Sequence, residues 1–277
     1  MTLDRISLIR PLQVIQAAVA AALLAACAAP DPGDGQAPIA RRVAAQLPID
    51  ALLLGEQHDA AEHQVIERET VLALAQGGRL AAVALEMAEA GNGTAHLPAD
   101  ATEAQVRTAL GWDDKGWPWA AYGPVVMAAV RAGVPVVGAN LQRAHMKDAM
   151  ADVSLDAQLA EAARADQQQA VRSGHCNLLP ESQIVPMTRI QIARDRAMAQ
   201  AVVKARVPGK TVLLVSGAGH GNKQLGVPQH LPTDVSVKAV RLRAGPPDES
   251  DRAFDAVWPT PALPEQDYCA GLRRPAG

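Results

Sequence analysis

Short, unbroken runs of apolar residues recur along the chain, and longer stretches with helical spacing separate them. Four runs have the length of a strand and lie at 49–54, 80–85, 134–139 and 211–216, and residues 235–242 alternate like a fifth strand. Strands that are apolar throughout are typical of parallel sheets whose two faces are both covered. The pattern therefore predicts an α/β fold with a mostly parallel sheet and helices on both of its faces.

The stretches between these runs predict helices. Asp59 stands where an N-cap is expected and Glu62 completes a capping box, so a helix should begin there and end near Gln76. Thr102 and Gln105 form a second capping box at the start of another helix. Further helices are expected at 124–132, 154–172 and 187–204.

The spacing of the elements also predicts how the chain is organised. The segment from about 87 to 133 is long for a connection between two strands, which predicts a helical insertion after the second strand. Residues 41–277 contain no internal repeat and are expected to form a single domain. The proline-rich segment 246–277 is expected to wrap around the surface of that domain.

The N-terminal segment has the layout of a secretory signal. Arg5 and Arg10 precede an apolar run at about 14–25, which is short for a membrane span. The run ends in Leu24-Ala25-Ala26-Cys27, which resembles the bacterial lipobox, where the cysteine is acylated and becomes the first mature residue. The alternative is an ordinary signal peptide that happens to contain a cysteine.

The lipobox interpretation predicts where the protein is located in the cell. Residues 1–26 would be removed as a signal peptide, Cys27 would carry the lipid that attaches the protein to a membrane, and residues 27–40 would form a flexible tether. Ala28 stands where an aspartate would retain a Gram-negative lipoprotein in the inner membrane. The expected location is therefore the outer membrane, with the protein facing the periplasm.

Composition narrows the function classes. Hydrophobic residues make up 49% of the chain and charged residues 20%, as in a globular protein. The net charge is −3 and basic residues occur in runs of at most two, so nucleic-acid binding, which needs a basic footprint, is not expected. Apart from Cys27, the chain has Cys176 and Cys269. An even pair in an exported protein indicates a disulfide, with two buried free thiols as the alternative.

Polar residues follow the predicted strands where those strands end. Glu56 and His58 follow the first strand, Glu86 the second, Asn140 the third and His220 the fourth. In open α/β sheets, ligands bind outside the carboxyl ends of the strands. These side chains are therefore expected to converge on one edge of the sheet and to form a functional site.

Two histidines are expected to lie close together beside Glu56. If Asp59 is the N-cap, His58 and His63 occupy the two positions of a hydrophobic staple, which meet in space. The alternative is that His58 only caps the helix and that His63 faces solvent.

One predicted helix carries an unusual stripe. Gln191, Arg194, Asp195 and Met198 are spaced so that they share roughly one side of the helix at 187–204. Amide and charged groups are uncommon on a core-facing side, so the stripe indicates a site. A solvated face with a local ion pair is the alternative.

Aromatic residues cluster in the predicted insertion. The chain has seven Phe, Trp and Tyr residues, and four of them are Trp112, Trp117, Trp119 and Tyr122. The cluster is interpreted either as a local core of the insertion or as a flat apolar surface for a planar ligand or a partner protein. Tyr122 could supply a phenol as a ligand.

Several segments, taken in order, resemble the ChaN-like family of haem-binding lipoproteins, which lies within the wider Tiki/TraB-like group. They are LLLGEQHDAAEHQ, VALEM, the Trp-rich segment ending in Tyr-Gly-Pro, VPVVGAN, HCNLLPES followed by MTRIQIARDRAMAQ, and VLLVSGAGHGNKQLGVPQHL. The resemblance covers about residues 49–242. It implies an α/β fold, haem binding tied to iron acquisition, and a dimer that stacks two haems face to face.

The resemblance also implies residue roles. The family implicates a tyrosine at the iron, and Tyr122 is the nearest match, since Tyr268 lies in the tail where the family is expected to have a proline. Besides Tyr122, the residues expected to bind the cofactor are His58, His63, His220 and Arg194. Arg143 and Arg189 are further candidates for the haem propionates. The CxxCH attachment motif is absent, so the haem would be held non-covalently.

The wider group implies an alternative. It includes metal-dependent peptidases that use Glu and His at the corresponding strand ends, so a hydrolase could hold a divalent metal ion there. The candidate ligands are Glu56, His58, His63, Glu86 and His220, and four of them, all but His63, are also candidate catalytic residues. A third interpretation is an envelope scaffold whose tryptophans bind a partner. The haem-binding interpretation is favoured over an enzyme.

Overall fold

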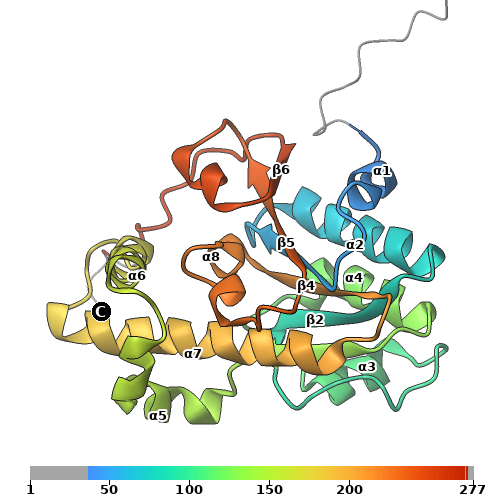
Figure 1. The fold of residues 1–277 in the computed structure, drawn as a ribbon, viewed down its shortest axis with the longest axis horizontal. Coiled ribbons are helices and arrows are strands. Elements are labelled where there is room, and N and C mark those ends of the chain that lie inside the picture. Colours follow the sequence, from blue (N-terminus) through green and yellow to red (C-terminus); the bar gives the residue numbers. More distant parts are fainter. Residues whose placement is uncertain (1–36, 272, 274–277) are drawn as a thin grey trace, which may run out of the picture. The chain divides into compact units, whose positions relative to one another are not determined.

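The computed structural model describes residues 37–271 and 273, and within them six strands form one sheet in which every neighbouring pair is parallel. The order across the sheet is β3-β2-β4-β1-β5-β6, and Figure 1 labels β2, β4, β5 and β6 among these strands. The strands are β1 (Ala51–Glu56), β2 (Leu80–Glu89), β3 (Val136–Asn140), β4 (Thr211–Gly217), β5 (Val237–Ala244) and β6 (Ala256–Thr260). The predicted α/β class and parallel sheet are confirmed.

Eight α-helices lie in the described part of the chain. They are α1 (Ile39–Ala44), α2 (Ala61–Gln76), α3 (Glu103–Leu110), α4 (Trp119–Arg131), α5 (Met146–Ala151), α6 (Glu161–Gly174), α7 (Glu181–Ala205) and α8 (Ala218–Gly221). Short 3-10 turns occur at Arg143–His145, Val153–Ala157, Val227–His230 and Glu249–Ala253. Helices α3 and α4 follow β2, as the insertion predicts.

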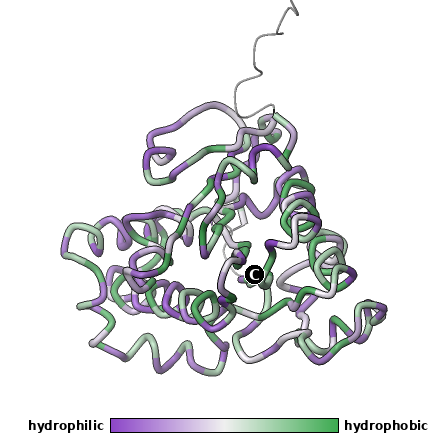
Figure 2. Tube along the Cα trace, turned by 45° about the vertical axis from the view of Figure 1, so that its right-hand side comes forward, coloured by the Kyte–Doolittle hydropathy of each residue, from purple (hydrophilic) through white to green (hydrophobic). Residues whose placement is uncertain are grey.

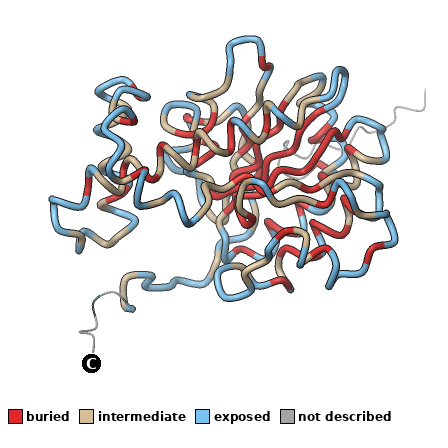
Figure 3. The backbone as a smooth tube through the Cα atoms, turned by 90° about the horizontal axis from the view of Figure 1, so that it is seen from below, coloured by how far each residue is buried: buried red, intermediate tan, exposed pale blue. Residues whose placement is uncertain are grey.

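The alternation of side chains along the strands divides the core between two faces. Leu52 and Leu54 of β1 pack with α2 and α4, whereas Ala51 and Leu53 pack with α7 on the other face. Successive side chains of a strand point to opposite faces, so an apolar run serves both cores. Figure 3 shows the buried positions gathered toward the middle of the described chain and the exposed ones toward its outside. Each fully buried leucine contributes about 1.5–3 kcal/mol.

Four helix starts differ from the sequence-based expectation. Helix α6 begins at Glu161 instead of 154, because residues 153–157 form a 3-10 turn, and α7 begins at Glu181 instead of 187. Helix α2 is capped at Ala60, not Asp59, and no side chain caps it. The capping box predicted at Asp59 and Glu62 is therefore wrong, because the Asp59 carboxylate accepts a hydrogen bond from the C-terminal tail instead. Helix α4 begins at Trp119 and contains Pro124, whose missing N–H removes one bond of the helical ladder.

The C-terminal segment contains the strand that the pattern did not predict. Strand β6 is short, includes Pro259 and pairs with β5 at the edge of the sheet. Proline is tolerated at an edge strand, where its missing N–H costs no central pairing. Beyond β6 the tail is fastened by a disulfide between Cys176 and Cys269, which confirms the predicted pair.

Hydrophobic and hydrophilic positions alternate along the helices that cover the sheet (Figure 2). Among the described residues, no helix is both long enough and apolar enough to cross a lipid bilayer. The predicted signal peptide, Cys27 and most of the predicted tether lie outside the described residues.

Candidate functional site

A cleft of about 920 Å³ opens at the carboxyl ends of the strands. Its wall combines strand ends, α7, the turn after β4 and the C-terminal tail. We call it the rim cleft, and its principal polar residues are Glu56, His58, Glu86, Arg194, His220 and Tyr268. Five of these six residues come from the predicted set, so the convergence expected from the strand ends is confirmed.

Glu56, at the end of β1, is the centre of one hydrogen-bond network. Its carboxylate accepts hydrogen bonds from the Tyr122 hydroxyl (2.7 Å), from His58 Nδ1 (2.8 Å) and from the amide of Gln64. Glu56 is buried, and these three donors satisfy the charge that burial would otherwise make costly. The network fixes the orientation of the His58 ring.

A second carboxyl group lies beneath Glu56. Glu67 of α2 is fully buried, and burial followed by the negative charge of Glu56 raises its pKa well above the ordinary value. Burial and the neighbouring charge therefore both favour the protonated form of Glu67. Glu67 was not identified from the sequence. The signal that could have found it is its helical spacing, since Glu67 lies on the same buried side of α2 as Gln64, Val71 and Leu74, where a carboxyl group is unusual.

Glu86 is the centre of a second network. Its carboxylate accepts the backbone N–H of Gly217 (2.7 Å), pairs with the Arg194 guanidinium, and lies 3.5 Å from His220 Nε2. Burial alone would raise the pKa of Glu86, but the positive charges of His220 and Arg194 outweigh it and hold the pKa far below its usual range. Glu86 is therefore a permanent carboxylate in the wall of the cleft.

His220 completes this network from the turn after β4. Its Nδ1 lies 2.6 Å from a carboxylate oxygen of Asp195 on α7. Burial would lower the pKa of His220, but the charges of Glu86 and Asp195 raise it to about 10. The ring is therefore an imidazolium at neutral pH, held between two carboxylates.

The stripe on α7 faces this network. Arg194 donates to Glu86 and, through Nε, to Asn140 Oδ1 (2.9 Å), and Asn140 in turn donates to the backbone carbonyl of Glu86 (2.9 Å). Asp195 binds His220, and Met198 is buried in the core. Arg194 and Asp195 thus contact residues of the cleft wall and are not a solvated face, whereas Met198 belongs to the core; a functional role of the stripe stays a prediction.

His58 is the exposed member of the Glu56 network. Its side chain is 41% exposed and packs edge-on against Trp117, with ring centroids 4.8 Å apart. Nε2 lies against Gly217, where an added Cβ would come within 2.9 Å of it. Burial would lower the pKa of His58, but the hydrogen bond to Glu56 and the charge of Glu86 raise it above the ordinary value.

His63 does not pair with His58 as the staple predicts. Its Nδ1 accepts the backbone N–H of Gln57 (2.9 Å) and its Nε2 lies 3.1 Å from the Thr260 hydroxyl. The cap at Ala60 moves both histidines out of the staple positions by one residue. His63 is fully buried and is not among the residues that line the cleft, so the predicted pairing with His58 is wrong, and its role as a ligand stays a prediction.

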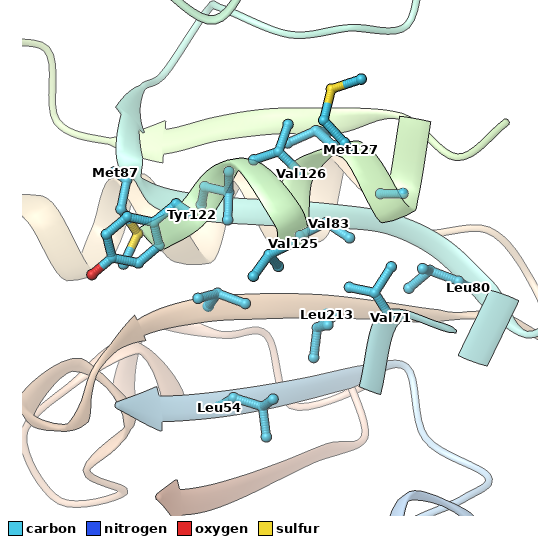
Figure 4. Packing of buried hydrophobic residues seen from close by; sticks show 14 of the residues in the cluster. Leu54, Val71, Leu80, Val83, Met87, Tyr122, Val125, Val126, Met127 and Leu213 are labelled. Carbon is cyan, nitrogen blue, oxygen red and sulfur yellow. The ribbon is translucent and has the colours of Figure 1, made fainter. Parts of the chain in front are cut away.

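The aromatic cluster packs mainly as a local core. Trp112 and Trp119 meet edge to face at 4.9 Å, and Trp117 meets Tyr122 in the same way at 5.8 Å. Tyr122 is only 1% exposed and lies in the hydrophobic cluster near the carboxyl ends of the strands (Figure 4). Burial, followed by the charge of Glu56, raises the pKa of Tyr122 far above its ordinary value.

Tyr122 lies deeper than expected for a ligand, and its role at the iron stays a prediction. Its hydroxyl lies beneath the cleft and is used to orient Glu56, so it presents no free oxygen to a ligand in the cleft. Sequence spacing could place Tyr122 near the site but could not tell the wall of a cleft from the layer below it.

The other tyrosine lies in the cleft. Tyr268 is 57% exposed, its hydroxyl donates to Asp59 Oδ2 (2.6 Å), and the amide of Gln57 donates to the same hydroxyl (3.4 Å). Arg241 and Arg243 of β5 also line the cleft and bind Asp251. The sequence carried one signal for Tyr268, namely its place next to Cys269.

The arrangement does not form a ready-made metal site. Among the described residues, no group of three or more His, Cys, Asp or Glu side chains is arranged to hold a metal ion. The oxygens of Glu56 and Glu86 are instead bonded to donors, chiefly Tyr122, Gln64 and Arg194. Of the two other candidate arginines, Arg143 pairs with Asp113 and Arg189 with Asp156.

A family model described as haem-binding uptake, Tiki superfamily, ChaN matches residues 43–231. A solved structure described as cofacial heme binding to ChaN of Campylobacter jejuni is similar with a TM-score of 0.66 and 24% identity, covering 78% of this chain and 89% of that one. The structure of the type III effector HopBA1 has 15% identity and a TM-score of 0.46, covering 82% and 95%. No curated protein sequence matches the chain.

Proposed function

Since the chain belongs to the ChaN family of haem-binding uptake proteins in the Tiki superfamily, we propose that it binds haem non-covalently in the rim cleft and serves in haem or iron acquisition. The observation that carries this proposal is the cleft itself, at the carboxyl edge of the sheet where α/β folds bind ligands. The solved ChaN of Campylobacter jejuni, which is described as binding haem cofacially, has the same fold.

The residues of the cleft fit a haem. Its volume of about 920 Å³ is within the range of small-molecule sites, about 300–1,000 Å³. Arg194, Arg241 and Arg243 bring guanidinium groups, which bind carboxylates such as propionates in a bidentate way. Tyr268 and His58 bring the kinds of oxygen and nitrogen donors that bind haem iron. A bound haem supplies a ferric centre there.

Haemin titration tests this proposal. The protein is titrated with haemin and followed by visible absorption, with size-exclusion chromatography of the same samples. We expect a saturable Soret band, and formation of a dimer as haem binds, since we also propose that two copies stack their haems face to face. If the Soret band is the same as that of haemin in buffer alone, or of haemin with an unrelated protein, the haem proposal is refuted. Binding without a dimer would refute only the stacked pair.

We also propose that the protein is a lipoprotein of the outer membrane, facing the periplasm. The support is the lipobox-like ending at Cys27, followed by Ala28, and the disulfide, which is a bond of oxidising compartments. Palmitate labelling and membrane fractionation test it. Cys27→Ala should abolish the label and move the protein to the soluble fraction, and labelling that persists in this variant would refute the anchor.

The Glu56–His58 pair favours a second candidate function, hydrolysis. A histidine oriented by a buried carboxylate is the usual form of a general base. The described geometry gives this function no metal site, so the base would act directly on water. Turnover of an ester or peptide panel that is lost in His58→Ala would support it, and metal analysis of the untreated protein would decide whether an ion takes part.

A further inference from the structure

We propose that the C-terminal tail, residues 261–269, is a strap at the mouth of the rim cleft, and that reduction of the Cys176–Cys269 disulfide releases it. Release lets a ligand enter and leave the cleft faster. The inference rests on the proposed function in one respect, because haemin is the ligand whose exchange is measured. The release itself is tested without any ligand.

The strap supplies one side of the rim cleft. Gln266 and Tyr268 line the cleft and are exposed, whereas the remaining lining comes from strand ends, α7 and the turns beside them. The tail leaves the end of β6 and runs toward α6, where the disulfide holds it (Figure 1). A cleft that loses this side is open to solvent over a wider angle, so the position of the strap determines how easily a large ligand passes.

Few bonds hold the strap apart from the disulfide. Within the described residues, the backbone hydrogen bonds of the tail beyond β6 stay inside the tail. The side-chain hydrogen bonds that join it to the rest of the described domain all involve the Tyr268 hydroxyl, which donates to Asp59 (2.6 Å) and accepts from Gln57 (3.4 Å). Chain termini are poorly ordered unless they are tied down. A strap held by this hydroxyl alone therefore opens often, because the bond must offset the chain entropy.

The other end of the disulfide lies on a turn that has its own support. Cys176 and Asn177 have φ values of 59° and 57°, a left-handed conformation that non-glycine residues rarely adopt. This conformation ends α6, because the Asn177 N–H donates to the Arg172 carbonyl (2.8 Å). The Arg172 guanidinium also pairs with Glu181 of α7. These bonds do not involve the sulfur atoms, so breaking the disulfide frees the strap and leaves the turn in place.

The disulfide is accessible to a reductant. Both cysteines are half-buried, and their neighbours Asn177 and Tyr268 are exposed. Exposed disulfides are the more easily reduced ones in exported proteins, and they are often regulatory. A second thiol-containing molecule can therefore reach the sulfur atoms without unfolding of the domain.

The redox step needs a dithiol reductant. One thiolate of the reductant attacks a sulfur of the disulfide and forms a mixed disulfide, and the displaced cysteine takes up a proton. The second thiol of the reductant then breaks the mixed disulfide. The reductant leaves oxidised as its own disulfide, and Cys176 and Cys269 remain as reduced thiols that carry the protons.

Limited proteolysis tests the release without a ligand. A glutamate-specific protease cuts after Glu265, an exposed residue of the strap, and mass spectrometry follows this cut with and without dithiothreitol. We expect reduction to speed the cut by at least about tenfold, because proteolysis follows the population of the open form. The double variant Cys176→Ser, Cys269→Ser should be cut at the fast rate and should not respond to the reductant.

Tyr268→Phe is a matched variant that keeps the disulfide. When oxidised it should be cut nearly as slowly as the wild type, since the disulfide still holds the strap. When reduced it should be cut faster than the reduced wild type, because the last bond to Asp59 is also lost. A wild-type rate that does not change on reduction would overturn the strap. Cuts that appear throughout residues 37–260 at the same rate would show global unfolding and would overturn local release.

Haemin exchange tests the effect on the cleft. Haemin binding and haemin transfer to excess apomyoglobin are timed for the wild type and the double cysteine variant, because thiol reductants themselves bind haem iron. Both rates should rise several-fold in the variant and the Kd should change less than either rate, since an open strap eases entry and exit alike. A rise in the transfer rate alone would overturn control of entry. Wild-type protein that binds no haemin would overturn the proposed function and this effect, whereas release of the strap is decided by the proteolysis.

Discussion

The imidazolium of His220 makes the stability of the protein depend on pH in a defined window. The ring lies between Asp195 and Glu86, and their charges raise its pKa to about 10, against an ordinary value of 6.5. A group whose pKa is raised by folding stabilises the folded state fully below its unfolded pKa, and this stability is lost as the pH rises through the folded pKa. The window therefore runs from about pH 6.5 to about pH 10.

The difference between the folded and unfolded pKa of His220 also sets an upper limit on the loss of unfolding free energy. At about 1.4 kcal/mol for each pKa unit, the interval from 6.5 to about 10 corresponds to an upper limit of about 5 kcal/mol. The loss is expected to stay below this limit, because Glu86 keeps Arg194 and the Gly217 N–H as partners after His220 loses its proton. Even half of the limit is a large part of the stability of a domain, about 5–15 kcal/mol.

Guanidinium chloride unfolding at several pH values between 7 and 10 measures this loss. His220→Gln keeps a donor for Asp195 but cannot titrate, so its unfolding free energy should change less with pH than that of the wild type. His58, whose pKa is also raised, is present in both proteins, and its pKa rises further in His220→Gln because the charge of His220 lowers it in the wild type; the NMR titration of His58 in both proteins corrects for this. Asp195→Asn provides a second variant. It removes one of the charges that raise the pKa of His220, so the pH range over which stability is lost should end at a lower pH. Equal pH dependence in wild type and His220→Gln would refute the reasoning.

Three further outcomes are expected. Tyr122→Phe removes one of three donors to the buried Glu56 and should lower the unfolding free energy by about 1.5–3 kcal/mol in urea titrations; an unchanged value would contradict the network. Gly217→Ala should displace the His58 ring, since the new methyl would come within 2.9 Å of Nε2, and should shift the NMR titration midpoint of that histidine; an unmoved midpoint would count against the close approach. Cys176→Ser opens a loop closed across 93 residues and should cost up to about 4–5 kcal/mol by chemical denaturation, whereas a change below about 1 kcal/mol would argue that the bond adds little.

The sequence predicted the site residues best where a local pattern, such as the end of a strand or one side of a helix, determines their position. Glu56, Glu86 and His220 each follow or end an apolar run, and parallel strands bring their carboxyl ends to one edge whatever the register. The helical period placed Arg194 and Asp195 on one side of α7, and both bind residues at that edge. Strand ends and helix faces are local properties, so local pattern was sufficient.

Other features depend on distances that no local pattern contains. The bond between Tyr268 and Asp59 joins residues 209 positions apart, and it removed Asp59 from the capping role that its spacing to Glu62 predicted. A shift of one residue in the cap was then enough to separate His58 from His63. The position of a residue along the chain also does not show how deeply its side chain is buried. Tyr122 was therefore expected in the cleft, whereas it lies beneath the cleft.

The central claim is that haem binds in the rim cleft at the carboxyl edge of the sheet. The most direct test is an anomalous-difference map, recorded at the iron absorption edge, from crystals grown with haemin. The account predicts an iron peak in the cleft, close to the wall formed by His58 and His220. An iron peak elsewhere on the protein, with the cleft empty, would contradict it.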